Sequence, residues 1–124
     1  MVNMKRNSER RRFIRFKARK GTYVSIRGKY YNLGQLIDIS TGGISFLYVA
    51  DGEEMSGRFS VDLFSLNDPI CLRNMQFKTI SDFNQDNESP PIHGGIRRCG
   101  GQFEKLMQSQ KSQLDYFIKN NTNE

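Results

Sequence analysis

Apolar and polar residues alternate through much of the chain between residues 22 and 103, and this alternation predicts short β-strands. β-branched and aromatic residues concentrate in the stretches 22–26, 36–39, 44–48, 58–64, 70–81 and 96–103. Turn-forming sequences such as Ala50-Asp51-Gly52 and Asn67-Asp68-Pro69 separate them. The pattern therefore predicts a mainly β protein, a compact antiparallel barrel or sandwich of about six strands.

The spacing of the apolar residues changes after Phe103. Steps of three and four residues now connect Leu106, Met107, Gln110, Leu114, Phe117 and Ile118. This spacing predicts an amphipathic helix, which we expect to cover an open end or face of the β-structure. Binding of a partner protein to an exposed apolar stripe is the alternative. The polar residues 120–124 predict a frayed tail.

A length of 124 residues favours one domain with a single core. No apolar stretch approaches the roughly 18 residues of a membrane span, and no apolar segment follows the basic N-terminus as in a secretory signal. Cys71 and Cys99 lie far apart without CxxC spacing, so free thiols are expected rather than a disulfide or metal site. We therefore expect a cytoplasmic protein.

The positive charge is concentrated at the N-terminus. Nine of the 19 Lys and Arg residues lie in residues 1–20, against one of the 13 Asp and Glu residues. The net charge of this segment is therefore +8, and that of the remaining residues is −2, which together give the +6 of the whole chain. Such asymmetry indicates an anionic partner, such as a phosphate, a nucleic acid or an acidic membrane surface. A solvated tail that only aids solubility is the alternative. We treat residues 1–20 as a basic arm and residues 21–119 as the folded domain.

Arginine is well suited to bind a phosphorylated purine, because its guanidinium group matches both phosphate oxygens and the O6 and N7 atoms of guanine. Arg11 and Arg15 are four residues apart, so a helical turn would place them side by side, and a looped arm could wrap both around one ligand. Arg10 adds donors that can stack on a base. An arginine cluster alone is also typical of nucleic-acid and lipid binders.

A second polar segment follows the predicted strand 36–39. Asp38 and Ser40 are two residues apart, so a strand would point both to one face. The carboxylate could accept from a guanine edge, and the hydroxyl could contact a phosphate or base. Gly42 and Gly43 permit positive φ angles and could leave amide groups free for an anion. A plain turn, capped by Asp38 or Ser40, is the alternative.

The two segments together resemble the signature of the PilZ domain, a family of bacterial receptors for cyclic di-GMP. The matching residues are Arg10-Arg11-x-x-x-Arg15 and Asp38-x-Ser40-x-x-Gly43. The late strand ending at Phe103 and the helix near residues 114–118 are similar to the family's layout. The resemblance extends from about Glu9 to Ile118.

This resemblance implies a six-stranded antiparallel β-barrel with a C-terminal helix. It also implies that Arg11 and Arg15 hold phosphate and guanine, that Asp38 and Ser40 meet a guanine edge, and that Gly43 shapes the turn. Arg10 occupies the position that in the family tends to accompany binding of an intercalated ligand dimer. No cofactor beyond the ligand is implied. A downstream protein partner is implied, in a process such as motility or biofilm regulation.

The sequence leaves three classes of function open. The first is a cyclic di-GMP receptor that signals to a protein partner. The second is a PilZ-like adaptor acting mainly through protein contacts in motility or pilus assembly. The third is a β-barrel that binds single-stranded nucleic acid through its basic arm and exposed aromatic residues. An enzyme is not expected, because His93 has no visible catalytic partner and no nucleophile–base pair, metal cluster or phosphate loop is present.

Overall fold

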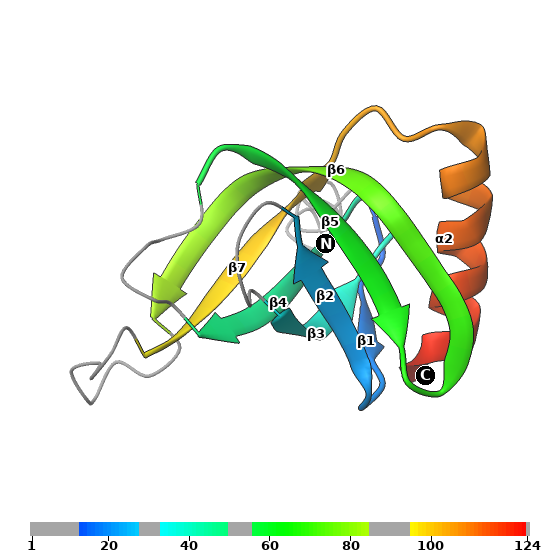
Figure 1. Cartoon of the computed structure of the whole chain (residues 1–124), viewed down its shortest axis with the longest axis horizontal. Coiled ribbons are helices and arrows are strands. Elements are labelled where there is room, and N and C mark those ends of the chain that lie inside the picture. The colour runs from blue at the N-terminus through cyan, green and yellow to red at the C-terminus, as the bar shows by residue number, and fades with distance from the viewer. Residues whose placement is uncertain (1–12, 28–32, 50–55, 85–94, 124) are drawn as a thin grey trace, which may run out of the picture.

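The computed structural model describes residues 13–27, 33–49, 56–84 and 95–123, and Figure 1 shows how they are arranged. They form eight strands and one helix. In chain order these are β1 (Phe16–Ala18), β2 (Thr22–Ile26), β3 (Leu33–Ile39), β4 (Gly43–Val49), β5 (Arg58–Ser65), β6 (Asp68–Asn84), β7 (Ile96–Phe103), α2 (Gln108–Asn121) and β8 (Thr122–Asn123).

Six of the strands close into an antiparallel barrel, as the resemblance implied. They are hydrogen-bonded in the order β2-β5-β6-β7-β4-β3, and β2 pairs again with β3 to complete the circle. The long β6 pairs with β5 along its first part and with β7 along its second. Figure 1 shows it curving over the barrel between these two neighbours. A shift of register at Ile80 marks the bulge in its second part, and bulges increase strand bending.

The core fills the barrel interior with side chains that alternate along each strand. In β4, Ile44, Phe46 and Tyr48 are buried, and Phe46 contacts the ring of Phe77 in β6 with centroids 6.0 Å apart. Side chains between them, such as Ser45, point to the outer face. This alternation explains why the strands were predictable from the sequence, because each strand has one apolar face.

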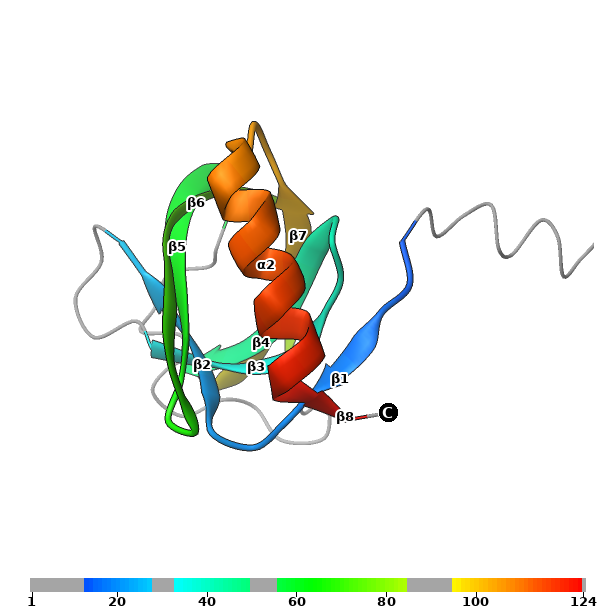
Figure 2. The same ribbon diagram turned by 90° about the vertical axis from the view of Figure 1, so that its right-hand side faces the viewer.

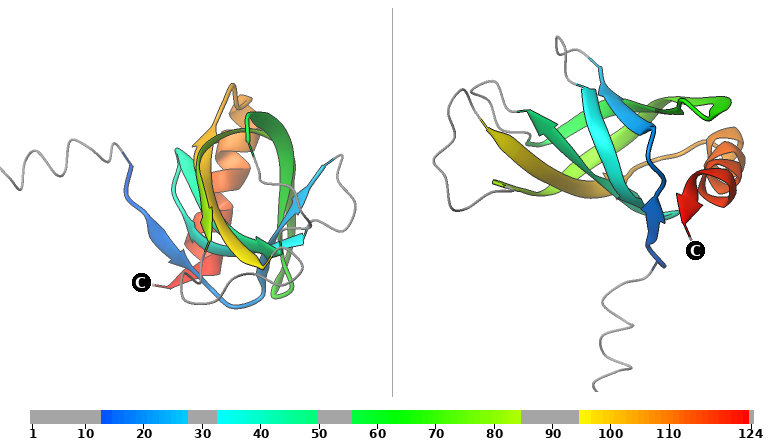
Figure 3. Two further views of the ribbon diagram at one scale, coloured as in Figure 1. Left: turned by 90° about the vertical axis from the view of Figure 1, so that its left-hand side faces the viewer. Right: turned by 90° about the horizontal axis from the view of Figure 1, so that it is seen from below.

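Helix α2 covers one end of the barrel (Figure 2). It buries Leu114, Phe117 and Ile118, which join the core. The ends of β4 and β6 and the start of β7 lie at the opposite end, as Figure 3 shows from two further sides. The helix prediction is therefore confirmed in its packing, although the helix begins at Gln108 rather than directly after Phe103. This helix of 14 residues is too short to cross a membrane, and it is the one helix among the described residues.

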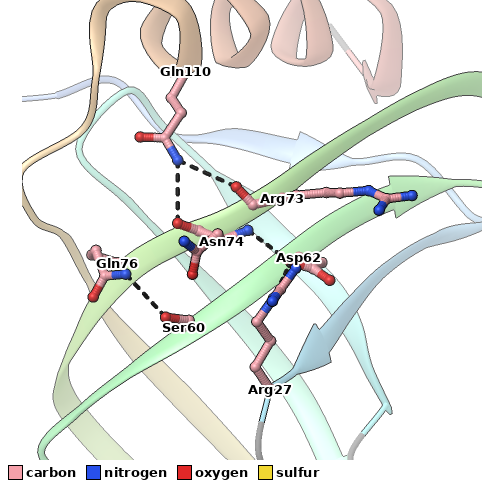
Figure 4. Close-up of polar contacts among 7 residues, drawn as sticks. All are labelled: Arg27, Ser60, Asp62, Arg73, Asn74, Gln76 and Gln110. Atoms are coloured by element: carbon pink, nitrogen blue, oxygen red, sulfur yellow. Dashed lines mark hydrogen bonds and ion pairs between the residues drawn. The ribbon is translucent and has the colours of Figure 1, made fainter.

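The N-terminal turn of α2 is fastened to β6 by one side chain. Gln110 donates from Nε2 to the carbonyls of Arg73 and Asn74, both at 3.2 Å, and its Oε1 accepts from the N–H of Met107 at 2.9 Å. Asn74 has a φ of 57° at this point, and its N–H donates to Asp62 in β5 (Figure 4). The helix is thus hydrogen-bonded to β6, and β6 in turn to β5.

Described residues of both the basic arm and the C-terminal tail form strands. The last part of the basic arm forms β1, which pairs with β3 and β8. Residues 120–123 are not a frayed tail, because α2 continues to Asn121 and β8 follows directly. Asn121 is 1% exposed and donates to the Phe117 carbonyl at 3.2 Å. Backbone pairing joins β1 and β8, which lie near the two ends of the described residues.

Candidate functional site

A cleft of about 400 Å³ lies on the outer face of the barrel, across β3, β4, β7 and β6. Its floor follows one row of cross-strand partners: Asp38 with Ser45, Ser45 with Gly100, and Gly100 with Ser81. Three of the four side chains in this row are small or absent. The floor is therefore low, and larger residues on either side of the row form the walls.

The residues singled out from the sequence come together at this cleft wherever the structure describes them. Arg15, Asp38, Ser40 and Gly43 all line it. They arrive from three places: the segment before β1, the end of β3, and the turn into β4. Arg10 and Arg11 lie outside the described residues. The two motifs, more than 20 residues apart in sequence, thus contribute to one surface.

Ser40 closes the turn between β3 and β4. Its Oγ accepts from the N–H groups of Gly42 and Gly43, both at 3.1 Å, and its own N–H donates to the Gly43 carbonyl at 2.9 Å. The expectation that these glycine amides are free for an anion is therefore wrong, and the turn-capping alternative describes Ser40. Ser40 also lines the cleft, although it is only 7% exposed.

Gly43 is required by close packing rather than by an unusual backbone angle. Neither Gly42 nor Gly43 is among the positive-φ glycines of the described segments, which corrects the expectation from the sequence. A Cβ atom on Gly43 would lie 2.0 Å from the carbonyl oxygen of Gly101 in β7. Any side chain here would separate β4 from β7 beneath the cleft.

Asp38 is held by an arginine that the sequence did not assign to the site. Arg98 in β7 donates from Nη2 to Asp38 Oδ2 at 3.3 Å and to Ser45 Oγ at 3.3 Å. The Asp38 and Arg98 side chains are 20% and 30% exposed, so both remain accessible from the cleft. Arg97 and Arg98 are adjacent in the predicted strand 96–103, and residue type alone does not distinguish them. Only strand alternation, with Arg98, Gly100 and Gln102 on one face, could have separated them.

The segment before β1 reaches over the cleft through Phe13 and Arg15. The ring of Phe13 lies so close to Gly42 that a Cβ atom on this glycine would be 2.2 Å from it. Phe13 nevertheless keeps 46% of its surface exposed. The ring packs on the glycine turn, which places the following Arg15 beside the floor residues.

The wall of the cleft on β6 is apolar. Ile80 and Phe83 are 59% and 50% exposed and line the cleft on this side. Ile80 lies at the bulge, where the register between β6 and β7 shifts. The sequence placed residues 70–81 in a strand but gave no sign of the bulge, so this wall was not predicted. A flat aromatic ligand could pack on such a surface.

The described residues contain no cluster of His, Cys, Asp and Glu suited to a metal ion. Cys71 is half-buried and Cys99 is buried, and both are free thiols. Burial raises the pKa of the Cys99 thiol to about 12, with the nearby Asp82 carboxylate adding to the increase. The chemistry on offer in the cleft is therefore recognition by two arginines, one carboxylate, hydroxyls and apolar side chains.

No protein-family profile matches the chain, and no curated protein matches it. Solved structures do. The PilZ domain with c-di-GMP of YcgR from Escherichia coli aligns with a TM-score of 0.69 at 19% identity, over 90% of this chain and 91% of that one. The MrkH–c-di-GMP complex of K. pneumonia aligns at 0.63 and 15% identity. YcgR in complex with c-di-GMP, also from Escherichia coli, aligns at 0.61 and 16% identity.

These alignments identify the architecture. The match to MrkH spans 89% of this chain and 51% of that chain, and the match to the longer YcgR chain spans 89% and 45%. The chain therefore corresponds to about half of those two proteins and to nearly all of the isolated domain. The protein has the fold of a PilZ domain.

Proposed function

We propose that this protein is a receptor for cyclic di-GMP. The observation that carries the proposal is the convergence of Arg15, Asp38, Ser40 and Gly43 on one cleft of about 400 Å³. A cyclic dinucleotide offers two phosphates, two flat bases and two guanine edges. The cleft offers cations for the phosphates, an apolar wall for a base, and a carboxylate for the N–H groups of guanine.

Each residue then has a separate role in the proposal. Arg15, with Arg10 and Arg11 from the arm, binds phosphate and the O6 and N7 side of guanine. Asp38 accepts from the guanine N1–H and N2–H groups. Ser40 keeps the turn in shape and lines the cleft, and Gly43 keeps β4 and β7 close together.

The proposed response to the ligand is closure of the arginine arm over the barrel. Phosphates neutralise the arm, and ordering it uses part of the binding energy. The closed arm and the barrel together then form a new surface for a protein partner in the bacterial cytoplasm. Hydrogen exchange of residues 5–20 should slow with saturating cyclic di-GMP. Unchanged exchange in this segment would contradict the closure step while leaving binding itself intact.

The binding test is a calorimetric titration with cyclic di-GMP, GTP and a short oligonucleotide. We expect tight binding of cyclic di-GMP and an affinity loss of about 10- to 150-fold in both Arg15→Ala and Asp38→Ala, because a charge-assisted hydrogen bond contributes about 1.5–3 kcal/mol. Arg58→Ala is the matched control. Arg58 is exposed and pairs with Glu104, and it does not line the cleft.

The same titration separates the other classes of function. Absence of cyclic di-GMP binding by the wild-type protein would refute the receptor and leave the adaptor. Affinity that rises with oligonucleotide length and falls steeply with salt would instead favour single-stranded nucleic acid. The stoichiometry reports whether Arg10 accompanies one bound ligand or an intercalated pair.

A further inference from the structure

Arg98 and Asp38 form a pair of opposite hydrogen-bonding character that faces the cleft. One nitrogen of Arg98, Nη2, makes the contacts to both Asp38 Oδ2 and Ser45 Oγ, each at 3.3 Å. A guanidinium group carries five N–H donors, so donors remain beyond these two contacts. Asp38 likewise has a second carboxylate oxygen. An acceptor and a donor therefore stand next to each other on the cleft surface.

We infer that this pair reads the Watson–Crick edge of guanine, with Asp38 accepting from N1–H and N2–H and Arg98 donating to O6. The inference rests on the proposed function and adds a residue outside both sequence motifs. On guanine, the N1–H donor and the O6 acceptor are adjacent atoms of the same edge. The spacing of an ion-paired carboxylate and guanidinium places an acceptor and a donor side by side in the complementary order.

Adenine presents the opposite order on this edge. Its N1 is an acceptor and its N6 amino group is a donor, so adenine would place an acceptor toward the carboxylate and a donor toward the guanidinium. Both contacts would then be repulsive or unpaired. Sites built to pair a specific polar group reject analogues that leave their own groups unpaired. The pair thus discriminates between the two purines by polarity rather than by size.

The preceding residue, Arg97, cannot take this role because its side chain does not face the cleft. It points into the barrel, where its Nε lies 3.1 Å from Asp82 Oδ1 and its Nη1 donates to Asn84 at 2.7 Å. Arg98 points outward, and its cross-strand partners are Leu47 in β4 and Phe83 in β6. The hydrogen bonds to Asp38 and Ser45 hold the guanidinium at the cleft before any ligand arrives, which reduces the entropy cost of base recognition.

The test compares cyclic di-GMP with cyclic di-AMP in direct titration and in competition. The proteins are wild type, Arg98→Ala, Arg98→Lys and the control Arg73→Ala, which removes an arginine outside the cleft. We expect Arg98→Ala to weaken cyclic di-GMP at least tenfold while cyclic di-AMP changes less than threefold. Arg98→Lys should restore part of the loss, because an ammonium group still donates to O6. Thermal unfolding confirms that each variant is folded.

Retained cyclic di-GMP affinity in Arg98→Ala would overturn the inference, and so would an equal weakening of both ligands. If neither the wild-type protein nor Arg98→Ala binds cyclic di-AMP, a crystal structure of the wild-type protein with cyclic di-GMP decides. An Arg98 nitrogen within about 3.2 Å of O6 supports the inference, and contact with phosphate alone overturns it. Failure of the wild-type protein to bind cyclic di-GMP is a different result, because it refutes the proposed function itself.

Discussion

Ala18 in β1 and Thr122 in β8 are cross-strand partners, so the two ends of the described chain are paired with each other. Beside this pair, the Arg19 N–H donates to the Asn121 carbonyl at 2.9 Å. On its other edge β1 pairs with β3 through Phe16 and Ile39. Strand β1, which directly follows Arg15, is therefore held between the barrel and the C-terminal strand.

A chain ending at Asn120 should lose this support. It lacks the buried Asn121, the acceptor for Arg19 and the whole of β8. With two or three hydrogen bonds lost at about 0.5–1.5 kcal/mol each, we expect the free energy of unfolding to fall by about 1–4.5 kcal/mol. Urea denaturation measures the loss, and hydrogen exchange should accelerate at residues 16–19. A chain ending at Asn123 keeps β8 and serves as the control; equal stability of the two truncated chains would contradict this role.

Gly43 and Gly100 lie on neighbouring strands, yet their replacement by alanine should have different effects. The new Cβ at position 43 would meet the backbone oxygen of Gly101 at 2.0 Å, and the backbone cannot yield without separating the strands. At position 100 the nearest atom is the Ser81 hydroxyl at 3.0 Å, which can rotate away. We expect Gly43→Ala to lower the free energy of unfolding by about 1–3 kcal/mol and Gly100→Ala to lower it by less than about 1 kcal/mol. Matched thermal and urea unfolding curves test this difference.

Features of this structure that depend on residues close together in the sequence were predictable, and contacts between residues far apart in the sequence were not. The strands and the helix were predictable because residues 22–26 or 114–118 carry their own apolar periodicity. Arg15, Asp38, Ser40 and Gly43 were identified by a resemblance of motifs. The role of Arg98 was not predictable, because its partner Asp38 lies 60 residues away and the contact depends on strand register. The β1–β8 ladder was missed because strands of three and two residues are too short to show a periodic pattern.

Arg97 and Arg58 offer a comparison between a buried and an exposed ion pair. The side chains of Arg97 and Asp82 are 11% and 7% exposed, whereas those of Arg58 and Glu104 are 66% and 28% exposed. Removing one partner of a buried pair costs about 3–5 kcal/mol, because the remaining charge loses its counter-ion inside the protein. Exposed pairs contribute about 0–1 kcal/mol. Arg97→Ala should therefore be strongly destabilising and Arg58→Ala nearly neutral in urea denaturation; similar values for the two would contradict this reading.

Cys99 should be unreactive toward thiol reagents in the folded protein. It is 0% exposed, and burial together with Asp82 raises the pKa of its thiol to about 12. Because the thiolate is the reactive form, an aromatic disulfide reagent at pH 8 should label the half-buried Cys71 first. Both thiols should react in denaturant. Rapid labelling of two thiols in the native wild-type protein, or of the remaining thiol in native Cys71→Ala, would contradict the burial of Cys99.

The raised pKa of Cys99 also sets the direction of a pH effect on stability. Its pKa is about 12 in the folded protein against 9.0 for an unperturbed thiol. Between these values the folded chain keeps the proton and the unfolded chain loses it, so rising pH favours unfolding. The contribution is fully present below pH 9 and is lost as the pH rises toward 12. One proton corresponds to about 1.4 kcal/mol per pH unit. Urea unfolding of Cys99→Ala between pH 8 and pH 10.5 should therefore show a shallower decline than wild type, and equal slopes for the two proteins would contradict the raised pKa.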